Sequence, residues 1–160
     1  MAETLEDLVK DQEPVDLRRV EKSLDAFDEL EDDLEAALSA LVWHRCTSGP
    51  NGMIGALLDP ECSGRNSVMV DHLEVVGAHE AASAFKELRE EFPSFDEQNR
   101  GSLIDWIDAK PEIARKANEL EDGLQDVEPV IIDFLRSRSD QLVEVPAVSG
   151  RFGFLSRWFG

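Results

Sequence analysis

Basic residues are scarce in this chain. Its 160 residues contain 16 Lys and Arg against 35 Asp and Glu, which gives a formal net charge of -19 at pH 7. Proteins that bind nucleic acids or anionic membranes by charge use clustered Lys and Arg to contact phosphates. The charge balance therefore excludes direct, charge-driven binding to nucleic acid or to an acidic membrane face. A large binding partner is expected to be basic.

Long apolar runs are also missing. No stretch approaches the roughly 20 apolar residues that a membrane-spanning helix requires. The N-terminal sequence, MAETLEDLVKDQEP, is acidic where a secretory signal is basic and then apolar. We therefore expect a cytoplasmic protein that makes no membrane contact.

The chain contains only two cysteines and three histidines. Cys46 and Cys62 could pair by number, but no other feature indicates an oxidising compartment, so free thiols are expected. The possible metal ligands are His44, Cys46, Cys62, His72 and His79. Only the first two are close in sequence, and residues two apart on a helix face different sides. We expect no metal site and no cofactor.

Signatures of catalysis are absent as well. The sequence has no G-x-S-x-G motif, and its Ser, His and Asp residues show no local pattern. Gly49, Gly52 and Gly55 lack the lysine and the strand-to-helix setting of a phosphate-binding loop, so they are interpreted as turn residues. The chain is therefore expected not to be an enzyme and to have no catalytic residues.

Apolar residues make up 42% of the chain, which suffices for one globular domain, and most follow helical spacing. Their stripe over residues 15–46 predicts a helix of about 30 residues. Further helices are predicted over 53–58, 68–76, 78–92, 102–107 and 111–138, with Gly77 and Pro93 as breaks and Gly123 as a further interruption. The prediction is an all-α single-domain bundle of roughly seven helices with a long acidic N-terminal helix.

The chain divides into three parts by composition. We expect an acidic N-terminal segment at 1–14, the all-α globular domain at 15–140 and an aromatic, weakly basic tail at 141–160. Residues 146–160 contain no acid, two arginines and the aromatic residues Phe152, Phe154, Trp158 and Phe159. Such a tail folds back on its domain, docks on a partner or forms a dimer contact, because clustered exposed aromatics are a liability in a soluble monomer.

Carboxylates recur at helical spacing within the predicted long helix. Steps of four, three, four and three between residues 21 and 35 place five of them along one helix edge. Successive carboxylates would lie roughly 5 to 7 Å apart, similar to the phosphates of a nucleic-acid strand. A second acidic group lies at 108–128. The candidate partner-binding residues are Glu21, Asp25, Asp28, Glu29, Asp32, Asp33, Glu35, Glu119, Glu121 and Asp122.

Two interpretations of these carboxylates remain open. The row imitates a phosphate backbone, or it is a solvated face whose repulsion is offset by packing of the leucine stripe. The second interpretation includes adaptation of the whole protein to a high-salt or GC-rich host.

The middle of the chain resembles a bacterial domain-of-unknown-function family that includes the acidic neisserial DNA-mimic protein. The motifs that carry the resemblance are Asn51-Gly52-Met53-Ile54, the run from Asp71 through Gly77-Ala78 to Ala82, and Glu91-Phe92-Pro93. The similarity spans about residues 30–138, and the chain looks like a divergent member. The resemblance implies an all-α fold, a homodimer, no catalytic centre and binding to DNA-binding proteins through surface carboxylates.

The leading hypothesis is an acidic, non-enzymatic DNA mimic that occupies the DNA-binding surface of a transcription regulator or nucleoid protein. The alternative is an acidic inhibitor or immunity-type protein against a basic toxin or nuclease. A third hypothesis is an interaction module whose functional part is the aromatic tail.

Overall fold

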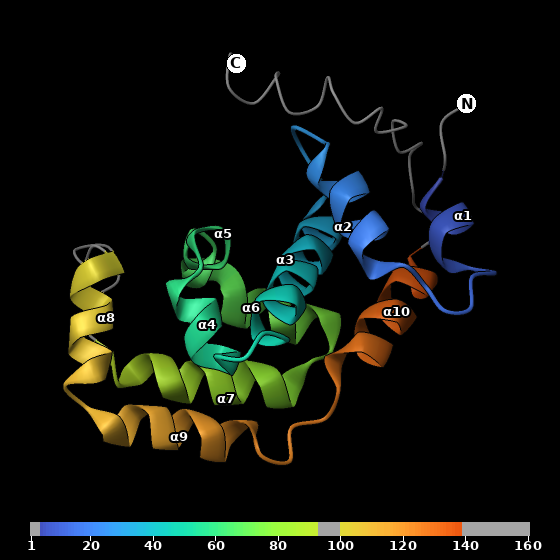
Figure 1. Cartoon of the computed structure of the whole chain (residues 1–160). Helices are drawn as coiled ribbons and strands as arrows, with labels where there is room; N and C mark the ends of the chain where they lie inside the picture. The colour runs from blue at the N-terminus through green and yellow to red at the C-terminus, as the bar shows by residue number, and fades with distance from the viewer. Residues whose placement is uncertain (1–3, 93–99, 139–160) are drawn as a thin grey trace.

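The computed structural model of the chain describes residues 4–92 and 100–138. Within these ranges the regular structure is helical, and no strand occurs in them. Figure 1 shows the arrangement of the helices. The ten helices of the described ranges are α1 (Leu5–Val9), α2 (Leu17–Asp25), α3 (Asp32–Thr47), α4 (Gly52–Leu58), α5 (Pro60–Ser63), α6 (Asn66–Val76), α7 (His79–Glu90), α8 (Arg100–Asp108), α9 (Pro111–Glu121) and α10 (Val127–Ser137). The predicted all-α class is confirmed.

Helix α3 is the centre of the core. Every residue from Ala36 to Trp43 is buried, a pattern typical of a helix that is covered on all sides. The cover comes from α2, α4, α5, α6 and α10, all of which contact α3. The other helices add their amphipathic faces around this centre. Fully buried side chains from several elements, such as Leu5, Phe85 and Ile131, belong to the same hydrophobic cluster.

Helices α6 and α7 form the predicted helix pair with a tight corner. Gly77 takes the left-handed conformation at the end of α6, with φ of 95°. The amide of Ala78 donates to the carbonyl of Leu73, which closes the helix end. Helix α9, which begins with Pro111 in its first turn as predicted, lies beside α7, and α8 connects to its start (Figure 1).

The predicted single helix over residues 15–46 is wrong. The chain leaves the helical path after Asp25 and resumes it at Asp32, so α2 and α3 are separate helices that pack on each other. A continuous helix would present its leucine stripe in one direction and leave the apolar remainder of α3 uncovered. The break places α2 on α3, and half-buried Phe27 and Leu30 anchor the connection to the core.

The helix count of roughly seven is also too low, because ten helices occur in the described ranges. The extra elements are short. Asp59 ends α4 and begins α5, accepting hydrogen bonds from the amides of Glu61 and Cys62. Near the N-terminus, Thr4 and Asp7 bond to each other's backbone amides and start α1. Its apolar residues are buried against α2 and α10.

The aromatic tail, with Phe152, Phe154, Trp158 and Phe159, lies outside the described residues, so its docking stays a prediction. The same holds for Pro93. In the part of the chain that is described, no helix combines the length and the apolar composition needed to cross a bilayer.

The corner at Gly77 makes a test of the fold. Replacing Gly77 by alanine should lower the free energy of unfolding by about 1–2 kcal/mol, because a Cβ is strained at this positive φ. The added Cβ itself has room, with Val130 Cγ1 as its nearest neighbour at 3.7 Å. The matched control is Gly64→Ala, where φ is -62° and a change below about 0.5 kcal/mol is expected. If urea unfolding shows that both variants lose the same free energy of unfolding, the left-handed corner at Gly77 is contradicted.

Candidate functional site

The carboxylates predicted to form one helical row are divided among three structural contexts. Glu21 and Asp25 belong to α2, with Asp25 as its last residue. Asp28 and Glu29 lie in the connection, and Asp32 is the first residue of α3. The predicted row along a single helix edge is therefore not formed. The physical reason is the break that lets α2 cover α3.

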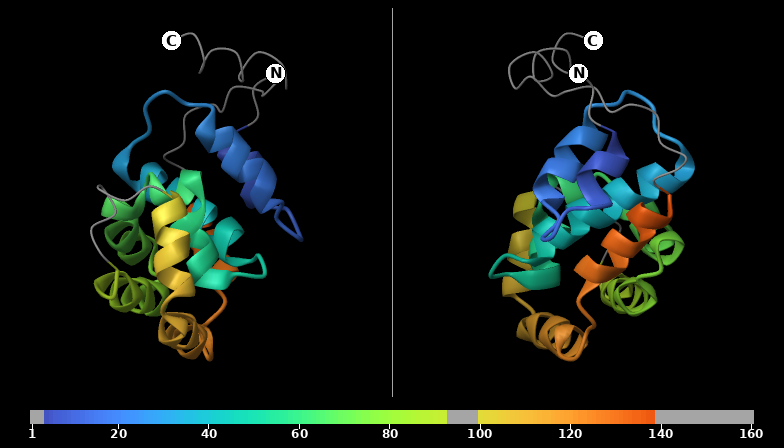
Figure 2. Two further views of the ribbon diagram at one scale, coloured as in Figure 1. Left: turned by 60° about the vertical axis from the view of Figure 1, so that its left-hand side comes forward. Right: turned by 90° about the vertical axis from the view of Figure 1, so that its right-hand side faces the viewer.

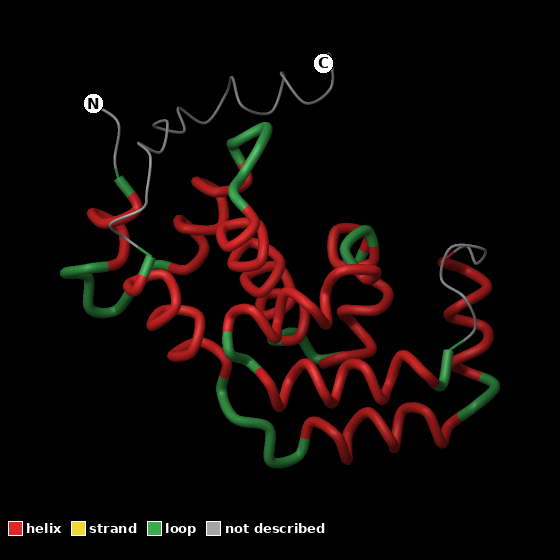
Figure 3. Tube along the Cα trace, turned by 180° about the vertical axis from the view of Figure 1, so that it is seen from behind, coloured by secondary structure: helices red, strands yellow, loops and turns green. Residues whose placement is uncertain are grey.

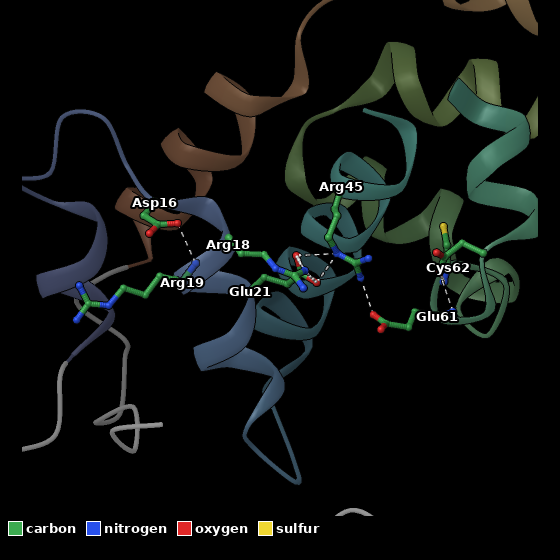
Figure 4. Close-up of polar contacts among 8 residues, drawn as sticks. Asp16, Arg18, Arg19, Glu21, Arg45, Glu61 and Cys62 are labelled. Carbon is green, nitrogen blue, oxygen red and sulfur yellow. Dashed lines mark hydrogen bonds and ion pairs between the residues drawn. The ribbon is translucent and has the colours of Figure 1, made fainter. Parts of the chain in front are cut away.

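Glu21 is turned into the protein and is 7% exposed. Its carboxylate accepts hydrogen bonds from Arg45 Nε at 2.9 and 3.2 Å and sits 3.4 Å from Arg18 Nη1. Arg45 also donates to Glu61 at 2.5 Å, so its guanidinium joins α3 to α2 and to α5 (Figure 4). Burial would lower the pKa of Arg45, but its bonds and charge attraction to Glu21 and Glu61 outweigh this and raise that pKa. Glu21 is a structural group and is inaccessible to a partner.

Two further members of the predicted set are neutralised by arginines of the same chain. Glu35 accepts a hydrogen bond from Arg65 Nη1 at 2.6 Å, which ties α3 to the start of α6. Asp33 accepts one from Arg138 Nε at 2.8 Å, at the end of α10. These carboxylates join helices, and the charge of each is partly offset by its arginine partner.

An exposed cluster remains at the α2–α3 connection and is named the acidic edge. It consists of Asp28, Glu29, Glu31 and Asp32. None of these carboxylates makes an ion pair or a side-chain hydrogen bond with another described residue. Figure 3 shows the connection projecting from the body of the molecule. Glu31 was missed by the sequence prediction because helical spacing places it off the row, whereas a non-helical connection brings neighbouring residues together.

The second acidic group lies at the opposite end of the molecule. Helix α9 and the connection α2–α3 are at opposite ends in Figure 1 and in both views of Figure 2. The carboxylate of Glu121 accepts from the amide of Met53 and so caps α4. Glu119 and Asp122 are exposed. The predicted set therefore does not form one continuous face.

A polar cluster supports α3 near the acidic edge. Ser39, which is fully buried, contacts His72 Nδ1 at 2.7 Å and receives a hydrogen bond from Arg65 Nη1 at 3.1 Å. Burial lowers the pKa of His72, and Arg65 acts in the same direction against the opposing charge of Glu35. This serine–histidine contact is partly buried between α3 and α6 and joins the two helices.

Among the residues that the structure describes, no three or more His, Cys, Asp and Glu side chains are grouped to hold a metal ion. The free thiols of Cys46 and Cys62, from α3 and α5, are close enough to shift each other's pKa, although their sequence separation gave no sign of it.

Searches against known proteins add no functional assignment, since no protein family, curated protein or solved structure matches this chain.

Loss of the Arg45 guanidinium should destabilise the fold. Arg45→Met leaves the Glu21 carboxylate buried without its main partner, and we expect the free energy of unfolding to fall by about 2–3 kcal/mol. Arg18→Met is the control. The Arg18 side chain is 56% exposed, so its removal should change stability by less than about 0.5 kcal/mol. Adding Glu21→Leu to Arg45→Met should restore part of the lost free energy of unfolding, because the unpaired buried carboxylate is then removed. If urea unfolding shows no such gain, the pairing of Glu21 with Arg45 is contradicted.

Stability should fall in mild acid through His72. Because its folded pKa is depressed, the imidazole binds a proton more weakly in the folded than in the unfolded chain. Its contribution to stability is therefore complete above about pH 6.5 and is lost as the pH falls from there through the folded value. Urea unfolding of the parent and of His72→Asn across this window measures the difference. If His72→Asn loses as much stability as the parent over this pH window, His72 is not the source of the acid sensitivity.

Proposed function

We propose that this protein is a non-enzymatic, acidic binding protein that uses the acidic edge to occupy the DNA-contacting surface of a basic DNA-binding protein, such as a transcription regulator or nucleoid protein. Dimerisation and a cytoplasmic location are parts of this proposal. The observation that carries it is a contrast around the α2–α3 connection: Glu21, Asp33 and Glu35 are paired with arginines of the chain, whereas the four neighbouring acids of the acidic edge are exposed.

The chain's own cations are placed on particular carboxylates. Arg45, Arg65 and Arg138 bond to acids that flank the acidic edge in sequence. Asp28 and Asp32 are left exposed. One projecting segment thus carries a group of exposed acids.

The acidic edge is compact on the scale of salt screening. Residues 28–32 span at most about 14 Å even if fully extended, and charges are screened over about 10 Å at 0.1 M salt. Their fields therefore add at a partner's surface. A basic DNA-binding groove would be attracted by this field, and association would be fastest at low salt. DNA itself would be repelled.

Stabilisation of the N-terminus of helix α3 explains the presence of only some of the acidic-edge carboxylates. Carboxylates near a helix N-terminus interact favourably with its dipole, each by about 0.3–1 kcal/mol. Asp32, in the first turn of α3, fits that role. Asp28 and Glu29 precede the N-cap residue Glu31 and lie outside the first turn, so the helix dipole gives little reason for their charge.

The mimic proposed here differs from the one expected from sequence. The negative groups would be presented by a bent connection and one helix start, with no straight helical row. This arrangement suits insertion into a narrow basic groove better than the replacement of a long duplex. The alternative client, a basic toxin or nuclease, would be bound through the same charges.

Charge reversal of the acidic edge tests the proposal. The triple variant Asp28→Lys, Glu29→Lys and Asp32→Lys should lose at least about tenfold in the capture of DNA-binding proteins from a lysate of the source organism, since three charge pairs become repulsive. The wild-type captures should be released by added duplex DNA and by salt. Mass spectrometry of the eluted proteins identifies the client.

The matched control reverses the same number of acids at the opposite end, with Glu112→Lys, Glu119→Lys and Asp122→Lys, so that the net charge is identical. This control should capture as the wild type does. Equal loss in both triples would show that total charge alone matters. Unchanged capture by the first triple, with loss on deletion of residues 146–160, would favour the tail; a toxin or nuclease in the eluate would favour the alternative client.

A further inference from the structure

The two cysteines of the chain lie on two elements that contact each other, α3 and α5. Cys46 is in the last turn of α3 and is partly exposed, whereas Cys62, in α5, is fully buried. Each thiol is the main influence on the pKa of the other, so the two sulfurs are neighbours. The residues immediately before them, Arg45 and Glu61, form an ion pair of 2.5 Å. The ion pair thus holds the end of α3 against α5, next to both cysteines.

The surroundings make the two thiols chemically unequal. The neighbouring Cys62 thiol lowers the pKa of Cys46, and the guanidinium of Arg45 adds to this, against the opposing effects of burial and of Asp59. The neighbouring Cys46, together with burial, raises the pKa of Cys62. The accessible sulfur is therefore the better nucleophile, and the buried sulfur stays protonated beside it.

We propose that Cys46 and Cys62 are an oxidation site that hydrogen peroxide converts into an intramolecular disulfide between α3 and α5. The inference rests on the contact between α3 and α5 and on the ion pair between the residues that precede the two cysteines, and it is independent of the acidic edge. The bond requires the sulfurs to approach to about 2 Å. Helix α5 has four residues, and its movement toward α3 is a small rearrangement.

The reaction has two steps. The Cys46 thiolate attacks one oxygen of the peroxide, so that a sulfur–oxygen bond forms, the O–O bond breaks and the leaving hydroxide takes a proton to become water. The Cys46 sulfenic acid then reacts with Cys62. The new S–S bond replaces the S–O bond, and the departing hydroxyl takes the thiol proton of Cys62 and leaves as a second water. The dithiol loses two electrons and the peroxide gains them.

The experiment exposes the reduced full-length protein to hydrogen peroxide and then to N-ethylmaleimide, followed by intact-mass analysis and peptide mapping. We expect a monomer with a Cys46–Cys62 link and neither thiol alkylated, reversed by dithiothreitol. The link should form more slowly when the chain is unfolded in urea. Alkylation of both thiols, a disulfide between chains, or equal rates with and without urea would overturn the proposal.

Single variants separate the two roles. Cys62→Ala should stop at the sulfenic acid of Cys46, which dimedone traps, and Cys46→Ala should leave Cys62 unoxidised while folded. Circular dichroism checks folding. If Cys62→Ala is unfolded, mapping of the wild-type chain decides alone, with the linked peptide supporting the proposal. A folded Cys62→Ala without a dimedone adduct would overturn the assigned order of attack.

Discussion

The burial of α3 on every side is the constraint on which the rest of this structure depends. The run Ala36–Trp43 has no face left for solvent, so several other helices must cover it. This requirement breaks the N-terminal helical stripe, turns α2 onto α3 and leaves the charged connection projecting (Figure 1). The location of the acidic edge is thus a consequence of how the core is closed.

The second organising influence is the placement of a few arginines in a strongly acidic chain. Each of Arg45, Arg65 and Arg138 forms an ion pair that joins α3 to another helix or to the end of one. They offset part of the like-charge repulsion that a net charge of -19 imposes. Partly buried pairs of this kind hold helix positions more than they add free energy. The acids that they leave unpaired carry the proposed function.

The acidic edge and the pair of cysteines lie at opposite ends of helix α3. The acidic edge is at its N-terminal end, and Cys46 is in its last turn. With a rise of about 1.5 Å per residue, a helix of this length puts roughly 20 Å between them. Oxidation of the thiol pair would thus act on α5 and the end of α3, while the acidic edge would bind its partner at the other end.

Local signals in the sequence determined much of the helical layout. Gly77 and Pro111 mark helix boundaries because each suits one backbone conformation, and the all-α class follows from the spacing of apolar residues. The tertiary structure alone decided which carboxylates are free, because Glu21 meets Arg45 across 24 residues and Asp33 meets Arg138 across 105. It also decided that Cys46 and Cys62 are neighbours. Side-chain pairing between helices depends on how the core is packed, and no local spacing encodes that.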